Sequence, residues 1–495
     1  MVNDVAPQRK TLLNQKNGIL ERQLARGTNI PSRQANAPGV ERLPRWNFPE
    51  WFIIAQTLLP GLLLITGSQV IRTPIRVAPY ALSLLGLVWW WHSKRRARVR
   101  AHPAGPWLLI ALGYLGIMMM HPRTNSWMAG LAQIALYLAV LAPVFWAPGL
   151  VHGPRHLARL LVLLFICNGV NSCVGILQVY NPEVWMPEEF SPQVTSNRYG
   201  LDAVSYIGPD GKRIIRPAGL FDAPGAVCGP AMVTAILGLI FCLAPGPLRN
   251  KALAAILGLA GMAAIYLSHV RSSFLVVAAM VLVSGGVLLF LQSEQLKAFL
   301  LIGLYASLLF AAFAFAVQLG GESVSERFTS LLEEDPFDLY YKSRGQQLQY
   351  GFNKLLVDHP LGAGLGRWGM VSAHFGDPNN NQSRPIWAEV QTSAWIIDGG
   401  FVLLILYGGA LMISTWRDFR LTGWGHPDLR FWALAVLAAN VGTLALIFSY
   451  TPFAGQIGMQ YWLLTGALHG AAAIRVQKRE VKGQKNSGLA FAPAP

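Results

Sequence analysis

Charged residues are scarce in this sequence. Asp, Glu, Lys and Arg together make up 13% of its 495 residues, about half the share of an ordinary soluble domain. Cysteine is scarcer still: there are four, all inside apolar runs, where a thiol usually acts as a small hydrophobe. These shortages exclude a soluble enzyme, a disordered scaffold and a secreted module held together by disulfides.

Long apolar runs are abundant. Hydrophobic residues make up 53% of the chain, the mean hydropathy is +0.39, and a membrane-spanning helix needs about 20 mostly apolar residues. We therefore predict an all-α, polytopic membrane protein with about twelve transmembrane helices. The runs cover residues 51–68, 77–91, 105–120, 126–148, 157–179, 224–245, 251–269, 272–292, 298–319, 393–415, 430–449 and 457–474.

The basic residues indicate the orientation. Alternate connections between the runs, together with both tails, hold 26 of the 40 Lys and Arg residues but only 8 of the 24 acids. Because Lys and Arg mark the cytoplasmic face, we predict that both termini are cytoplasmic, and the net charge of +16 needs no nucleic acid to explain it. Because the first 45 residues are polar, we expect no cleavable signal peptide. We expect a cytoplasmic tail 1–46, a transmembrane domain 47–475 and a cytoplasmic tail 476–495.

Two long segments fall on the opposite, outer face. Residues 181–223 follow the fifth run and residues 320–392 follow the ninth, whereas the other connections are short. Within the second segment, residues 337–357 carry apolar side chains at helical spacing, which predicts a helix on the membrane surface or packed on the spans. Long outer loops are where such a protein can build a site.

Four short stretches on the predicted outer face carry unusual residues. Arg271 is the most informative, because an arginine in a very tight turn between two apolar runs is costly unless it faces a cavity or a partner. A guanidinium grips phosphate with two donors, but snorkelling or a salt bridge to an acid such as Asp222 explains Arg271 about as well. The stretches are RPAGLFDAPGAVCG (216–229), SHVRSSFL (268–275), KSRG (342–345) with HPLGAGLG (359–366), and EVQTS (389–393) closed by DGG (398–400).

The carboxylates near these stretches are candidates for proton transfer. Glu389 and Asp398 lie near the start of a run, where partial burial favours the protonated form. Taken alone, each is better explained as an interfacial acid or as part of a structural ion pair. For His374 and Asp377, an ordinary surface loop is the favoured explanation, and an acid–base pair is the less favoured alternative.

Two further patterns argue against cofactors. The stretch GAGLG at 362–366 follows no strand, so a tight turn that allows close packing explains it better than a nucleotide site. The ten histidines show no metal-ligand spacing, and we predict no metal. We expect no cofactor of any kind.

Taken together, the four stretches resemble the O-antigen ligase and O-antigen polymerase (Wzy-like) superfamily of bacterial membrane glycosyltransferases. That family carries an R-x-x-G-x-F-x-x-P stretch before a span, an arginine at an outer turn, and a large outer loop with an arginine on a helix and an H-P-L-x-G-x-G-x-G stretch. Here these are Arg216 to Pro224, Arg271, Arg344 and His359 to Gly366. The resemblance covers about residues 216–400. This chain departs from it at Glu389, where ligases carry a histidine, and His269 stands where a small residue is common.

The resemblance implies a GT-C-like fold with a large, partly helical periplasmic loop between spans nine and ten. It also implies transfer, in the bacterial inner membrane, of a glycan from an undecaprenyl-pyrophosphate carrier to another glycan, a lipid core sugar or a protein. Arg216, Arg271 and Arg344 would then bind the pyrophosphate, and Glu389 would orient or deprotonate the acceptor, with Asp222 as the substitute. The aromatic residues that could stack on sugars, although membrane anchoring suits most of them better, are Trp185, Tyr199, Tyr340, Trp368 and Trp387.

Two other classes of protein stay open at this stage. A flippase of lipid-linked oligosaccharide would also have about twelve spans, but its polar groups would lie near the middle of the bilayer. A structural component of an envelope assembly explains the spans but not the ordered arginines. Convergence of Arg216, Arg271, Arg344 and Glu389 on one outer cleft would favour the transferase.

Overall fold

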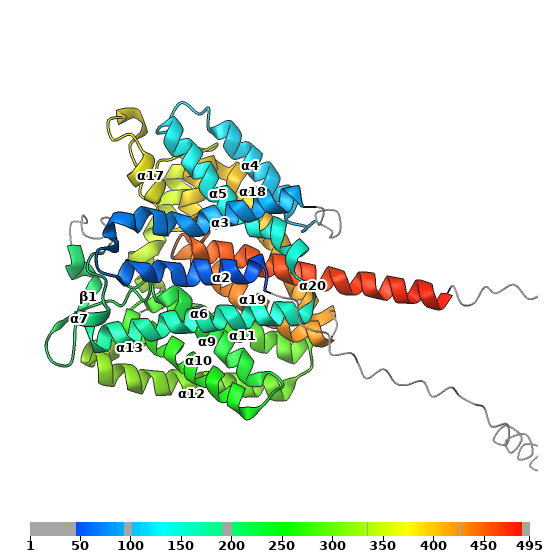
Figure 1. Ribbon diagram of the computed structural model, residues 1–495. Coiled ribbons are helices and arrows are strands. Elements are labelled where there is room, and N and C mark those ends of the chain that lie inside the picture. Colours follow the sequence, from blue (N-terminus) through cyan, green and yellow to red (C-terminus); the bar gives the residue numbers. More distant parts are fainter. Residues whose placement is uncertain (1–45, 94–100, 191–199, 334, 425–426, 488–495) are drawn as a thin grey trace, which may run out of the picture. The chain divides into compact units, whose positions relative to one another are not determined.

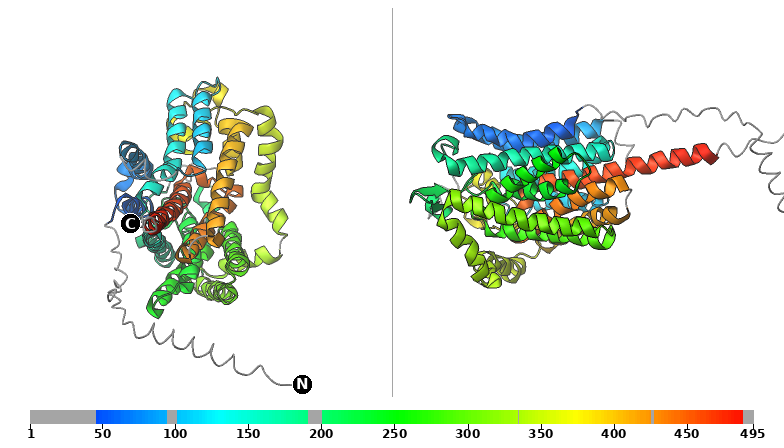
Figure 2. Two further views of the ribbon diagram at one scale, coloured as in Figure 1. Left: turned by 90° about the vertical axis from the view of Figure 1, so that its right-hand side faces the viewer. Right: turned by 90° about the horizontal axis from the view of Figure 1, so that it is seen from below.

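The computed structural model describes residues 46–93, 101–190, 200–333, 335–424 and 427–487. This part of the chain is almost entirely helical (Figure 1). Nearly all of the predicted tail 1–46 lies outside the described residues, as does Tyr199. Within the predicted C-terminal tail 476–495, helix α20 continues through residue 487 and projects beyond the other helices (Figures 1 and 2).

Each of the twelve predicted runs coincides with a helix. The structure places these helices at α2 (Phe48–Leu58, extended by η1, Leu59–Leu64), α3 (Arg72–His92), α4 (Gly105–Met118), α5 (Trp127–Leu150), α6 (Pro154–Tyr180), α9 (Cys228–Leu243), α10 (Leu248–Ser268), α11 (Arg271–Gly286, extended by η5, Val287–Leu291), α12 (Gln295–Gly320), α18 (Gln391–Trp424), α19 (Pro427–Ala445) and α20 (Gln456–Ser487). Seven helices in the described residues are long and apolar enough to cross a membrane: α5, α6, α10, α11 with η5, α12, α18 and α19. The all-α membrane class is confirmed, and the count of twelve spans stays a prediction.

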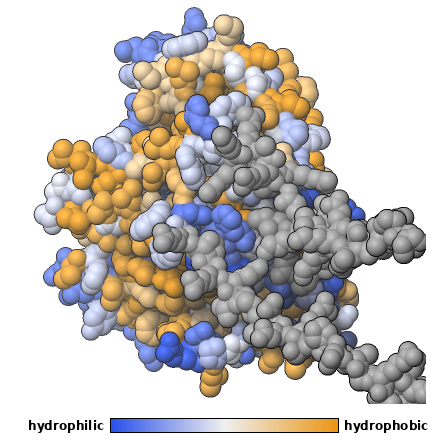
Figure 3. All heavy atoms as spheres, turned by 45° about the vertical axis from the view of Figure 1, so that its right-hand side comes forward, coloured by the Kyte–Doolittle hydropathy of each residue, from blue (hydrophilic) through white to orange (hydrophobic). Residues whose placement is uncertain are grey.

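The surface of the helices is apolar where a soluble protein would be charged. Helix α12 shows this best, since Phe299 and Phe310 expose 67% and 76% of their surface. Figure 3 shows hydrophobic residues spread across one face of the molecule. Lipid is the solvent in which such a surface is stable.

Glycines allow helices α9 and α10 to pack closely. Helices α9 and α10 pack so tightly that a Cβ on Gly238 would lie 2.7 Å from the Cα of Gly258, and one on Gly261 would lie 2.8 Å from the carbonyl oxygen of Ala231. Small residues at such positions let helix backbones approach within a membrane, where van der Waals packing drives association. This pair supports the loop before α9 and the turn after α10, which both reach the candidate site.

The short elements gather at one end of the helices. Figure 1 shows β1, α7 and α13 at this end, opposite the projecting end of α20. They are α7 (Pro182–Trp185), η4 (Gly200–Val204), the antiparallel hairpin of β1 (Ser205–Ile207) and β2 (Arg213–Ile215), α13 (Glu322–Glu333), α17 (Gly369–Phe375) and η8 (Asn381–Ser383). The helix predicted over 337–357 is confirmed as the continuous run α14 (Pro336–Tyr340), η6 (Tyr341–Gly345), α15 (Gln346–Tyr350), η7 (Gly351–Leu355) and α16 (Leu356–Asp358), here called the surface helix.

The GAGLG stretch forms a packing turn, as its sequence predicts. Gly362 has a φ of 113°, and a Cβ there would lie 2.9 Å from the Cα of Gly399. In return, Gly400 has a φ of 59° and a Cβ there would lie 1.9 Å from the carbonyl oxygen of Pro360. Helix α18 is kinked at Gly399 and Gly400, so the turn and the kink fit into each other. This contact fixes the segment around residues 360–364 on helix α18.

Candidate functional site

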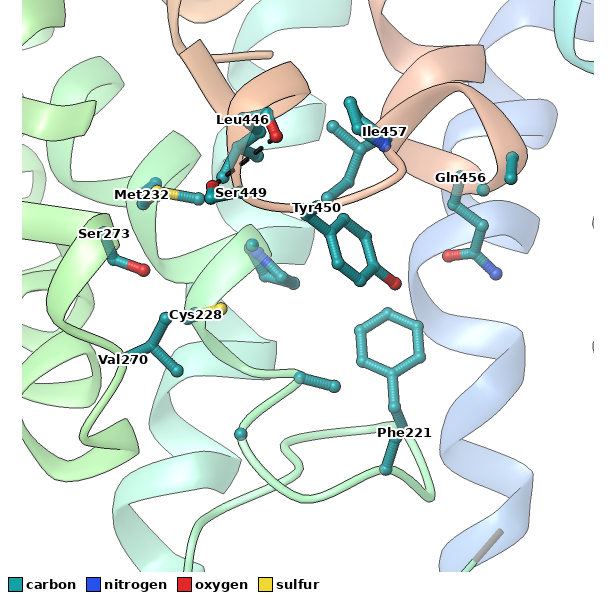
Figure 4. Close-up of a pocket in the computed structure, with 18 of the residues that line it drawn as sticks. Phe221, Cys228, Met232, Val270, Ser273, Leu446, Ser449, Tyr450, Gln456 and Ile457 are labelled. Carbon is teal, nitrogen blue, oxygen red and sulfur yellow. Dashed lines mark hydrogen bonds between the residues drawn. The ribbon is translucent and has the colours of Figure 1, made fainter. Parts of the chain in front are cut away.

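A cavity of about 1320 Å³ opens among α3, α11, α12, the surface helix and the loops at the hairpin end. Figure 4 shows part of its wall, with Phe221 facing the ring of Tyr450, and Ser273 and Cys228 on another side. Apolar side chains of α3 and α5 line one region, and arginines line another. The cavity therefore combines apolar and cationic surfaces.

The loop that follows β2 brings two of the predicted residues to this cavity. The side chain of Gln178 on α6 donates to the carbonyl of Gly219 at 2.7 Å and accepts from its N–H at 2.8 Å. Gly219 has a φ of 66°, and a Cβ there would lie 2.0 Å from Oδ1 of Asn171, so only glycine fits. This tight turn places Arg216 and Asp222, on either side of it, in the cavity wall.

The turn between α10 and α11 carries Arg271. His269 adopts the left-handed conformation, with a φ of 55°, and lets the chain reverse within two residues. Ser268 Oγ accepts from the N–H of Val270 at 3.3 Å. Arg271, the first residue of α11, lines the cavity, as do His269 and Val270. A non-glycine residue in this conformation is costly and often marks a functional site.

Arg344 reaches the same cavity from the surface helix. Its Nε donates to the carbonyl of Ser449 at 3.2 Å, and its guanidinium forms an ion pair with Glu389. Tyr340, one turn earlier, donates to the carbonyl of Phe448 at 3.0 Å. Arg344 and Tyr340 line the cavity, whereas Glu389 reaches it through Arg344. Glu389 and Arg344 are therefore in direct contact, which matches the explanation of Glu389 as part of an ion pair.

Asp222 is held by helix α3. Its Oδ1 accepts from Arg76 at 2.5 Å, and its Oδ2 lies 3.2 Å from Nε of Arg72. Asp222 is 4% exposed, so the carboxylate is enclosed by these guanidinium groups. Neither arginine was predicted, although their spacing of four residues would place both on one face of a helix.

Positive charge dominates the cavity wall. Among the described residues that line it there is a single acid, Asp222, and five arginines: Arg76, Arg216, Arg271, Arg327 and Arg344. Burial lowers the pKa of Arg216. For His269, burial and then the neighbouring Arg216 and Arg327 lower the pKa to about 3, so its imidazole is neutral near pH 7. An anionic ligand would offset this charge.

Asp398 lies outside this cavity. It is fully buried, and its Oδ2 accepts hydrogen bonds from Gln133 at 3.1 Å and from Tyr137 and Trp368 at 2.8 Å each. These bonds tie the segment that carries Trp368 to α5 and α18, so Asp398 has a structural role. Trp368 is 4% exposed and cannot stack on a sugar.

The other predicted candidates lie apart from one another. Trp387 is 71% exposed and lines a separate pocket beside the surface helix, and Trp185 is 38% exposed. His374 lines the main cavity, whereas Asp377 belongs to a turn in which its Oδ1 accepts from the N–H of Asn379 at 2.9 Å. Within the described residues, no group of three or more His, Cys, Asp or Glu side chains could hold a metal ion.

No protein-family model and no curated protein matches this chain. The functional argument therefore depends on the cavity and on the residues that meet in it.

Proposed function

We propose that this protein is a metal-independent membrane glycosyltransferase that moves a glycan from an undecaprenyl-pyrophosphate carrier to an acceptor on the periplasmic face of the bacterial inner membrane. The observation that carries the proposal is that Arg216, Arg271 and Arg344, from three separate segments, line one cavity. The reaction would serve polymerisation or ligation of a surface polysaccharide. The hairpin end would face the periplasm, and both termini would be cytoplasmic.

The apolar part of the cavity suits a lipid carrier. Val77 on α3 and Leu275 on α11 both line the cavity, and 47% and 62% of their surface is accessible. Accessible apolar side chains of this kind suit contact with a hydrocarbon chain. A prenyl tail in this part of the cavity would bring its pyrophosphate to the arginines.

The proposed reaction uses the carrier itself as the leaving group. The acceptor hydroxyl oxygen attacks the anomeric carbon and forms the new glycosidic bond. The bond between that carbon and the diphosphate oxygen breaks, and its electron pair stays on the diphosphate. Arginines fixed in a partly dry cavity stabilise this charge as it develops, so neither a nucleotide nor a metal is needed.

Glu389 is the better of the two acids for taking the acceptor proton. It is bound on one side by Arg344, and its side chain is 27% exposed. Asp222 faces guanidinium groups with both oxygens, so its part in the proposal is to hold Arg72 and Arg76 at the wall.

The variant Arg271→Lys tests the phosphate-binding role. Lysine keeps the charge and loses the two-pronged donor, so we expect transfer to a glycan acceptor to fall by about 10²-fold, the typical loss for one preorganised donor. Purified protein with carrier-linked oligosaccharide is the assay, and Arg384→Gln, an exposed change in the outer loop, is the control. Undiminished transfer by Arg271→Lys would remove this residue from the site.

Glu389 is tested by comparing Glu389→Gln with Glu389→Asp. Glutamine keeps a hydrogen-bonding group but cannot accept the proton, whereas aspartate can. We expect activity to be lost in the first variant and partly kept in the second. Full activity of Glu389→Gln would exclude proton transfer at this position.

A lipid-linked oligosaccharide flippase has less support. The buried aspartates of α18, Asp398 and Asp418, accept hydrogen bonds from neighbouring side chains and do not line the cavity. The cavity arginines instead gather near the hairpin end. A flippase would move intact carrier-linked glycan across vesicles without changing its length or attachment, which the same purified protein can test.

A further inference from the structure

His269 is a polar residue in the tight turn between the apolar helices α10 and α11. The residue is 5% exposed and lines the cavity. Its imidazole stacks on the ring of Tyr206 in β1, with centroids 3.9 Å apart and planes at 22°. Within the described residues its Nε2 is buried without a hydrogen-bond partner. A buried polar atom left in this way costs free energy, which a ligand atom could recover.

The loop that carries Arg216 is folded against the same turn. The N–H of Gly225 donates to the carbonyl of Arg216 at 3.3 Å. A Cβ on Gly225 would lie 3.5 Å from Val270 and 4.0 Å from Cδ of Arg216. The side chain of Arg216 therefore lies next to the residues that follow His269.

Helix α13 brings a further arginine. Phe328 packs among the aromatic rings of Tyr266, Phe274 and Phe313, with centroids 5.2 to 5.8 Å away. This cluster joins α13 to three neighbouring helices and fixes the adjacent Arg327, which lines the cavity. Both Arg216 and Arg327 lie close enough to His269 to disfavour its protonation.

We propose that His269 and Arg327 complete, together with Arg216, a subsite that binds one phosphate group of an organic diphosphate. The inference deepens the proposed function and rests on it for the identity of the diphosphate. Two guanidinium groups supply charge and forked donors, and the imidazole, which is neutral before the phosphate binds, supplies one further hydrogen bond. Tyr206 acts as a positioning residue that keeps the imidazole in place.

The test measures binding, not transfer. The probe is a farnesyl diphosphate capped with one N-acetylglucosamine, added to the full-length protein in phosphatidylcholine nanodiscs. We expect Arg327→Gln to weaken probe binding about tenfold, as for the loss of one charge-assisted contact. Arg384→Gln is the matched control and should bind the probe as the wild type does. Equal affinity of Arg327→Gln and wild type would overturn the subsite.

His269→Phe provides a second variant that keeps the stack on Tyr206. It removes both ring nitrogens, and we expect binding to weaken several-fold while the melting temperature stays the same. Wild-type affinity of His269→Phe would remove His269 from the subsite even if Arg327 remains in it.

The pH dependence distinguishes a ligand contact from a packing role. The charged groups around the imidazole are Arg216, Arg327 and, two residues along, Arg271, while Tyr206 covers one of its faces and stays neutral because burial raises its pKa. A bound phosphate anion favours the protonated imidazole and raises its pKa, so the complex takes up a proton. Affinity of the wild type should therefore rise as the pH falls from 8 to 5. A profile that is as steep in His269→Phe would contradict the inference.

The lipid composition of the nanodiscs distinguishes two sources of the phosphate group. If phosphatidylglycerol nanodiscs abolish probe binding to wild type but not the weaker binding to Arg327→Gln, the subsite stands and its occupant is a lipid headgroup. If the probe binds equally in both lipids, the occupant is the carrier diphosphate. Because neither result needs glycan transfer, the subsite and the proposed transferase can fail separately.

Discussion

At the scale of single residues, the role of each arginine depends on the groups that surround it. Arg344 contacts a glutamate, Arg76 contacts the buried Asp222, and Arg216 is largely desolvated in the cavity wall. Removing a guanidinium from water is costly unless a partner or ligand compensates. The protein maintains this arrangement through backbone positions such as Gly219 that tolerate no side chain.

Gly219→Ala tests how far one backbone position supports the site. We expect the free energy of unfolding to fall by about 1–3 kcal/mol, because alanine is strained at a φ of 66° and meets Asn171. Transfer should fall as well, since Arg216 and Asp222 flank this turn. Urea unfolding in detergent is the measurement. Gly113→Ala, where a Cβ would meet nothing within 4 Å, is the control and should leave stability nearly unchanged.

At the scale of elements, the surface helix and the kinked helix α18 act together. The Arg344–Glu389 ion pair and the bond from Tyr340 hold the surface helix at the cavity. The predicted helix over 337–357 could be found from the spacing of its apolar residues. Its contact with Glu389 could not, because Arg344 and Glu389 lie 45 positions apart in the sequence.

A charge swap across this pair distinguishes a structural role of the ion pair from a chemical role of the cation at position 344. The pair is partly exposed, with Arg344 at 38%, so its coupling free energy should be only about 0.5–1 kcal/mol. We expect the double variant Arg344→Glu with Glu389→Arg to melt close to the wild type and yet to be inactive, because the cation has left its place. Recovery of transfer in the double variant would show that only the pairing matters.

At the scale of the whole molecule, the position of the cavity and the distribution of basic residues point to the same end of the helices as the proposed functional end. Helices turn their apolar sides outward, and the arginine-lined cavity lies toward the end that carries the hairpin. The sequence predicts that end to be periplasmic, because the alternate connections assigned to the other face, together with both tails, hold 26 of the 40 Lys and Arg residues.

Cysteine labelling in spheroplasts tests this orientation. In a background where the four native cysteines are replaced by serine, Asp210→Cys in the exposed hairpin turn should react with an impermeant maleimide in intact spheroplasts. Asn250→Cys, at an exposed position in the first turn of α10, should react only after permeabilisation. The reverse pattern would invert the topology and remove the periplasmic site.

The sequence by itself determined the helical membrane class, the positions of the apolar helices, the surface helix and the packing role of the GAGLG turn. These follow from hydropathy, helical spacing and glycine conformation, all of which are local properties. Only the tertiary structure decided which cations share a cavity. It brought in Arg76 and Arg327, joined Arg344 to Glu389, and placed Asp398 in a structural network, because such contacts depend on how distant helices pack and not on neighbouring residues.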